Sequence, residues 1–153
     1  MAISPLVAVG DISNAEVADM TKEATQFLMS HSWCKSIASS HLAWACAGVL
    51  GVFLFRIVPS RPDVDELLWV VVGDVPTAYL VQEGNPTWRD ALDAYIIEMR
   101  RWVDAVRAGR PFDDLVPVAA EATLEHANML ADRLDFIAKE ILDPDAGEVE
   151  SDT

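Results

Sequence analysis

Two apolar runs in the middle of the chain carry apolar side chains at odd and even positions alike. The first spans residues 49–55 and the second spans residues 67–72. Both are rich in β-branched and aromatic residues, which favour strands. A strand without apolar–polar alternation has to be covered on both of its faces. The pattern therefore predicts two neighbouring strands, over residues 49–58 and 66–73, in a sheet that is covered on both sides.

Two further segments extend this sheet. Residues 37–47 contain alanines that suit a helix, but the break at Gly48 and the strand after it favour the first arm of a hairpin; both readings stay open. A turn at 73–76 leads into a short fourth strand over residues 78–81. Parallel crossovers need a dozen or more residues, so these short connections favour antiparallel pairing. We expect an antiparallel β-meander of about four strands.

Apolar side chains at three- and four-residue steps predict three amphipathic helices. The first covers residues 14–30 and opens with a capping box, Ser13-Asn14-Ala15-Glu16. The second is capped either by Asn85 followed by Pro86 or by Thr87 with Asp90, and it ends at Gly109. The third starts near Thr123 and ends at Asp143-Pro144.

Together these elements predict an α+β fold in the order α-β-β-β-β-α-α, with the helices packed against the sheet. A chain of 153 residues is long enough for one buried core. We expect a single domain over residues 13–142. It is preceded by a loosely attached arm (1–12) and followed by an acidic disordered tail (143–153) that contains no basic residue.

One segment allows a membrane-spanning alternative, because no charged residue lies between Lys35 and Arg56. A spanning helix needs roughly 20 largely apolar residues, so this length is borderline. The serines at its start and the glycines further on favour strands instead. Residues 1–10 have no charged segment of the secretory kind, and the two cysteines fit reduced thiols. We therefore expect a cytoplasmic protein that does not enter a membrane.

The charge is strongly unbalanced, with 25 acidic against 11 basic residues and a formal net charge of −14. A negative field repels phosphate backbones, so nucleic acid is not an expected partner. A basic protein fits this charge better. A second copy of the chain is another expected partner, because a homodimer would let two copies share an apolar face.

Metal and cofactor chemistry finds little support in the sequence. His31, Cys34, His41 and Cys46 are zinc-type ligands, but on a strand residues 41 and 46 would point to opposite faces. A nucleophilic role for Cys34 is disfavoured, because it follows a helix C-terminus, where the dipole opposes a thiolate. No phosphate loop, dinucleotide fingerprint or nucleophile elbow occurs. We expect neither a metal nor a cofactor.

Two groups of charged residues are candidate binding residues. Asp63 in the 59–65 loop, together with Asp74 and Glu83, would line a cleft at one end of the sheet. Arginines on the second helix either pair with its own acidic residues, Glu98 or Asp104, or contact an anion, which suits their planar groups. The candidate anion contacts are Arg100, Arg101 and Arg107.

Three stretches, residues 48–57, 69–80 and 95–118, resemble a family of small bacterial proteins without an established activity. The resemblance covers about residues 28–142 and implies no catalytic residue. The sequence as a whole favours a non-enzymatic, self-associating protein-interaction module of an adaptor or immunity type. The alternative is a small enzyme or ligand-binding protein that uses the cleft near Asp74, Glu83 and the 59–65 loop.

Overall fold

The computed structural model describes residues 7–8, 14–111 and 122–142. Most of the expected arm (1–12) and all of the expected acidic tail (143–153) lie outside these residues. The chain divides into two compact units, residues 1–91 and 92–153. The first unit contains the sheet and one helix, and the second contains most of the other two helices.

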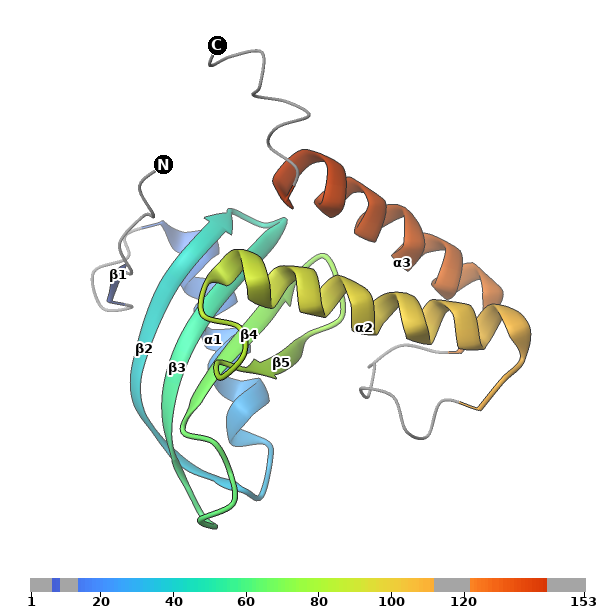
Figure 1. Cartoon of the computed structure of the whole chain (residues 1–153). Coiled ribbons are helices and arrows are strands. Elements are labelled where there is room, and N and C mark those ends of the chain that lie inside the picture. The colour runs from blue at the N-terminus through green and yellow to red at the C-terminus, as the bar shows by residue number, and fades with distance from the viewer. Residues whose placement is uncertain (1–6, 9–13, 112–121, 143–153) are drawn as a thin grey trace. The chain divides into compact units, whose positions relative to one another are not determined.

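The sheet is an antiparallel meander of five strands in chain order (Figure 1). Its strands are β1 (Val7–Ala8), β2 (Cys34–Cys46), β3 (Leu50–Pro59), β4 (Leu67–Gly73) and β5 (Ala78–Val81). The four expected strands and the α+β order are confirmed, and residues 37–46 belong to a strand, β2. The additional β1 pairs through two residues with the outer edge of β2, opposite His41 and Leu42.

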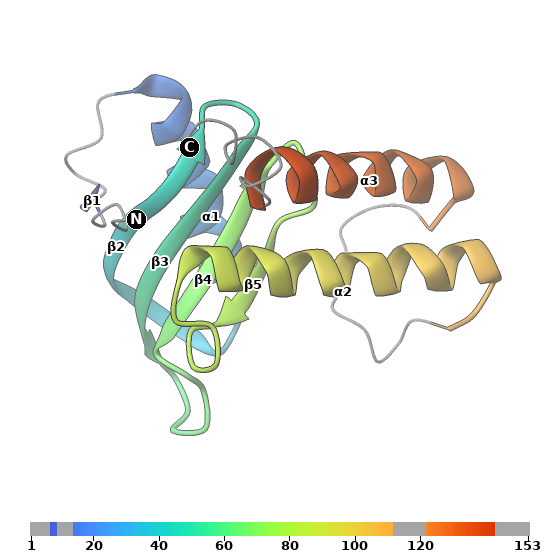
Figure 2. The same ribbon diagram turned by 45° about the horizontal axis from the view of Figure 1, so that its top comes forward.

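One face of the sheet packs against α1 (Ala15–Met29), which runs across it in Figures 1 and 2. Asn14, not the predicted Ser13, is the N-cap of this helix, and its side chain accepts a hydrogen bond from the Val17 N–H. Gly51 lets the helix approach closely, since a Cβ there would crowd the Met20 side chain at 3.0 Å. The buried core between α1 and the sheet consists of Val17, Met20, Ala24, Leu28, Cys34, Phe53, Phe55, Ile57, Leu68, Val70 and Val72.

The opposite face of β3 and β4 is also buried. Val52 lies opposite Val71 in the ladder, and neither side chain has exposed surface. The segment after β5 lies against this face, because Trp69 Nε1 donates to the Asn85 carbonyl oxygen at 2.7 Å. Trp88 stacks on Trp44 with a centroid distance of 5.3 Å. The predicted double burial of the two central strands is therefore confirmed.

Helix α2 (Trp88–Ala108) begins with the second of the two predicted caps. The Asp90 N–H donates to Thr87 Oγ1, and the Thr87 N–H donates back to Asp90 Oδ2, both at 3.2 Å. Helix α3 (Leu124–Ile137) starts next to Thr123 as expected, with Thr123 as its N-cap, and continues as a π-helical turn, Ala138–Leu142. In the second unit α2 and α3 run antiparallel, joined by an ion pair between Arg100 and Asp135 at 3.1 Å.

The uncharged segment between Lys35 and Arg56 forms β2, a turn and β3, and so is not a spanning helix. In the part of the chain that the structure describes, no helix combines the length and apolarity needed to cross a bilayer.

The turn after β4 generates the first testable prediction. Gly73 has a φ of +135°, and a Cβ there would overlap the carbonyl oxygen of Val49. We expect Gly73→Ala to lower the free energy of unfolding by about 3 kcal/mol or more, because left-handed strain of roughly 1–3 kcal/mol adds to the overlap. Urea unfolding followed by circular dichroism measures this loss.

Gly84→Ala is the matched control. Gly84 also has a positive φ, +88°, but nothing lies within 4 Å of the added carbon. Its cost should be about 1 kcal/mol, from backbone strain alone. Equal losses in the two variants would contradict the contact assigned to Gly73.

Candidate functional site

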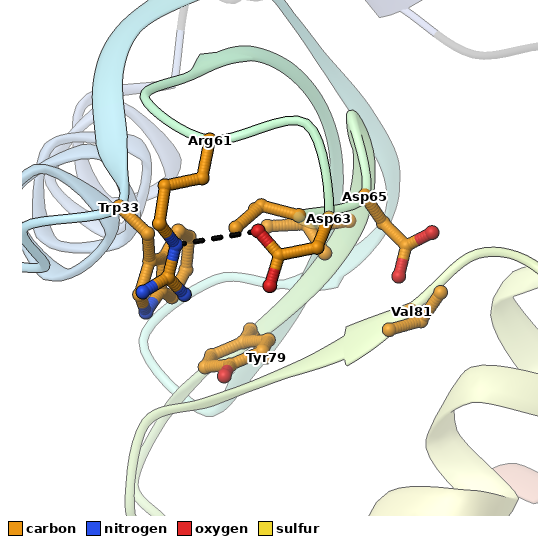
Figure 3. A pocket seen from close by; sticks show the side chains of 8 residues that line it. Trp33, Arg61, Asp63, Asp65, Tyr79 and Val81 are labelled. Carbon is orange, nitrogen blue, oxygen red and sulfur yellow. Dashed lines mark ion pairs between the residues drawn. The ribbon is translucent and has the colours of Figure 1, made fainter.

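A cavity of about 210 Å³ opens at the end of the sheet where β3 leads into β4 (Figure 3). All of its lining belongs to the first unit. The α1–β2 connection contributes one residue, the β3–β4 loop contributes four, and β4 and β5 contribute the rest. The lining residues are Trp33, Arg61, Asp63, Val64, Asp65, Leu68, Tyr79 and Val81.

Strand pairing and a hydrogen bond from the β3–β4 loop bring these residues together. Val81 lies opposite Leu68 in the ladder between β4 and β5, and Tyr79 lies opposite Val70. The Ser60 N–H donates to the Trp33 carbonyl oxygen at 2.9 Å, which fixes the start of the β3–β4 loop next to the start of β2. The floor of the cavity is therefore part of the sheet, and its rim is a loop tied to the sheet.

Aromatic side chains form one wall. The rings of Trp33 and Tyr79 meet edge to face at 5.1 Å, and the His31 ring lies 4.6 Å from Trp33 and 5.6 Å from Tyr79. His31 Nδ1 is 2.9 Å from the Phe27 carbonyl oxygen. A carbonyl oxygen only accepts, so Nδ1 carries a proton and donates it. The wall is thus ordered by mutual ring packing and by a hydrogen bond to α1.

Carboxylates form the rim. Asp63 and Asp65 are exposed, and Arg61 Nε lies 3.3 Å from Asp63 Oδ1. The side chains of this pair are 61% and 73% exposed. Ion pairs in such surroundings contribute roughly 0–1 kcal/mol, since water competes for both charges. The pair therefore does little to hold the loop and can exchange its partners.

A second cavity, of about 400 Å³, adjoins the first and shares Val64, Asp65 and Val81 with it. Glu66 and Glu83 add two carboxylates to its lining. The basic residue in the lining of the second cavity is Arg56, whose Nη1 contacts Glu66 Oε1 at 3.0 Å. Together the two linings contain four carboxylates, Asp63, Asp65, Glu66 and Glu83, against two arginines, Arg56 and Arg61.

The structure brings two of the three predicted cleft residues to this end of the sheet. Asp63 lines the first cavity and Glu83 lines the second. Asp74 follows β4 at its other end, where its N–H donates to the Val49 carbonyl oxygen, and it lines neither cavity. The sequence reasoning did not identify Trp33 and Tyr79, which are 46 positions apart. The signal available was that Tyr79 lies within the predicted strand 78–81 and that Trp33 precedes the predicted arm 37–47.

The three candidate arginines do not converge on a common point. Arg107 makes two hydrogen bonds to Asn128 Oδ1, at 3.0 and 2.7 Å, and Arg100 pairs with Asp135, so both contact α3. Arg101 pairs with Glu98 on its own helix at 3.3 Å, as one of the two readings predicted. The contacts of Arg100 and Arg107 link α2 to α3, and the contact of Arg101 lies within α2. None of the three supports an anion site.

No group of three or more metal-type ligands occurs within residues 7–8, 14–111 and 122–142. One expectation about these ligands is wrong. His41 lies opposite Leu54 and Cys46 lies opposite Leu50, so both point to the same face of the sheet. The register shift between Leu42 and Trp44 reverses the alternation that an unbroken strand would have.

No protein-family model, curated protein or solved structure matches this chain. The comparisons thus lend no support to the family resemblance, and the proposals below rest on the geometry of the described residues.

The two cysteines differ in a way that can be measured. Cys34 is buried in the core under α1, and burial raises the pKa of its thiol because it disfavours the charged thiolate. Cys46 is exposed. At neutral pH we expect one thiol, Cys46, to react rapidly with a disulfide reagent and Cys34 to react at least about tenfold more slowly, since the thiolate is the reacting form.

Cys46→Ser should abolish the fast phase, and Cys34→Ser should leave it unchanged. A fast phase that survives in Cys46→Ser would show that Cys34 is accessible and would contradict its place in the core.

Proposed function

We propose that this chain is a non-enzymatic protein-interaction module that binds a basic segment of a partner protein at the β3–β4 end of its sheet. The observation that carries the proposal is the cavity itself, which combines an aromatic wall with an acidic rim. Trp33 and Tyr79 form the wall, and Asp63 and Asp65 form the rim. The adjoining carboxylates of Glu66 and Glu83 extend the surface to more than one cationic side chain.

The physical chemistry of these groups favours a cation. The face of an aromatic ring is electron-rich and attracts ammonium and guanidinium groups within about 6 Å. A carboxylate beside the ring supplies the opposite charge and hydrogen-bond acceptors. Neither group alone defines such a site, but their occurrence in one cavity supports cation recognition.

The size of the cavity supports a side chain as its occupant. Pockets for drug-sized molecules hold roughly 300–1,000 Å³. The first cavity, at about 210 Å³, is smaller than this range. It is therefore better matched to one side chain of a protein partner than to a whole small molecule.

The distribution of charge supports the same proposal. The full chain carries 25 acidic and 11 basic residues. The net charge of −14 attracts a basic partner from a distance, and the carboxylates of the rim determine where its cationic side chains bind.

A small ligand-binding protein or enzyme is the second candidate. The observation in its favour is the second, larger cavity of about 400 Å³, which lies within the pocket range and is lined by Asp65, Glu66 and Glu83. This candidate would be favoured if a small metabolite binds the protein with a dissociation constant that does not change when basic peptide is added in excess.

The proposed function includes three further properties: self-association, an adaptor or immunity-type role, and a cytoplasmic location. Two-fold homodimers are the commonest assemblies of soluble proteins, and a shared apolar face would form one. Sedimentation velocity tests self-association directly. If the protein is a strict monomer at high concentration, self-association is wrong, and the proposed cation site is unaffected.

A peptide titration tests the proposal. We expect a synthetic peptide of alternating lysine, arginine and glycine to bind the intact chain. Asp63→Asn/Asp65→Asn should weaken binding about tenfold, the effect of losing about 1.4 kcal/mol across two charge contacts. Raising the salt from about 50 to 500 mM should weaken binding to the unaltered protein, because it screens exposed charges. Isothermal titration calorimetry measures both effects.

Glu16→Gln/Asp19→Asn is the matched control, since it removes two exposed carboxylates from the start of α1, where Glu16 lies at the β2–β3 turn and neither residue lines a cavity. It should change affinity by less than about twofold, through the long-range field alone. If the control pair loses as much affinity as the cavity pair, binding follows net charge and the proposed site is wrong.

A further inference from the structure

Arg61 and Asp63 line the same cavity and pair with each other. In Figure 3 a dashed line joins Arg61 to the Asp63 carboxylate. The two residues belong to one loop and are two positions apart. The cavity that would receive a cation from a partner therefore already contains a cation of the chain itself.

The ion pair between Arg61 and Asp63 uses only part of the hydrogen-bonding capacity of the two groups. A guanidinium group carries five N–H donors in a planar fork that can contact a carboxylate through two parallel bonds. Arg61 contacts Asp63 through Nε, at 3.3 Å, and its side chain is more than half exposed. A guanidinium that arrives from outside can instead approach Asp63 and the neighbouring Asp65 with the open end of its fork.

The wall favours a guanidinium over an ammonium group. A guanidinium is flat and weakly hydrated, so it stacks on an aromatic face at a lower desolvation cost. An ammonium is compact and strongly hydrated, and it gains less from the same surface. Trp33 and Tyr79 hold the wall in place by edge-to-face contact at 5.1 Å, so the surface exists before a partner arrives.

We infer that the cavity takes the side chain of an arginine from the partner, which replaces Arg61 on Asp63. Arg61 is the internal competitor of that side chain, and Asp63 is the shared acceptor. This inference rests on the proposed function and adds the identity of the recognised residue and the exchange. No covalent bond forms or breaks, because the exchange replaces one ion pair with another.

The two members of the pair should have opposite effects on affinity. An oligo-arginine peptide is titrated into the full chain by isothermal titration calorimetry. Arg61→Gln should bind about three- to tenfold more tightly than the unaltered protein, because the competitor is gone, and Asp63→Asn at least about threefold more weakly. An oligo-lysine peptide of equal length should bind the unaltered protein at least about threefold more weakly than oligo-arginine.

Lys22→Gln controls for net charge, since it removes one exposed cation from α1, away from the cavity. Its affinity should stay within about twofold of the unaltered protein. In an Asp63→Asn background, Arg61→Gln should bring no gain, since the acceptor that the two cations share is absent. Far-ultraviolet circular dichroism checks that each variant is folded.

The outcomes separate the two proposals. If oligo-arginine binds but Arg61→Gln behaves like Lys22→Gln, the exchange at Asp63 is wrong and the acidic interaction module stands. If oligo-lysine and oligo-arginine bind equally, the selectivity for guanidinium is wrong. If neither peptide binds at any salt concentration, the proposed function fails, and the exchange fails with it.

Discussion

Burial of the two central strands on both faces is the constraint on which the first unit depends. Phe53 and Val70 pack under α1, while Val52 and Val71 point away from it, and all four are fully buried. A shift of one residue in either strand would interchange the two faces and misplace every apolar side chain. The register is thereby fixed, and so is the place where the β3–β4 loop leaves the sheet. The floor of the cavity is ordered because residues at the ends of these strands form it.

This same constraint explains how much of the fold could be predicted. Apolar runs without alternation identified β3 and β4, and the Thr87–Asp90 pair, one of the two caps left open for α2, is the one that the structure has. Residues 7–8 gave no periodic signal, because a two-residue strand is shorter than any period, so β1 was not foreseen. Ser13 and Asn14 are both good caps, and local sequence does not decide between adjacent candidates.

The candidate site was less predictable because it depends on contacts between distant residues. The meander puts the 59–65 loop and Glu83 at one end of β4 and Asp74 at the other, so proximity in sequence grouped residues that the fold separates. Trp33 and Tyr79 meet only through the pairing of four strands. The bulge near residue 43 moves His41 and Cys46 onto one face, and no residue type in β2 announces it.

The proposed binding role agrees with the contrast between the packed floor and the exposed ion pairs of the rim at this end of the sheet. Association is opposed by the loss of freedom in the groups that it orders, and a wall that is already packed avoids most of that loss. The rim has the opposite property: its ion pairs, Arg61–Asp63 and Arg56–Glu66, are at least half exposed and contribute little to stability. Groups that the fold does not need for its own stability are the ones that a partner can use without destabilising the sheet beneath them.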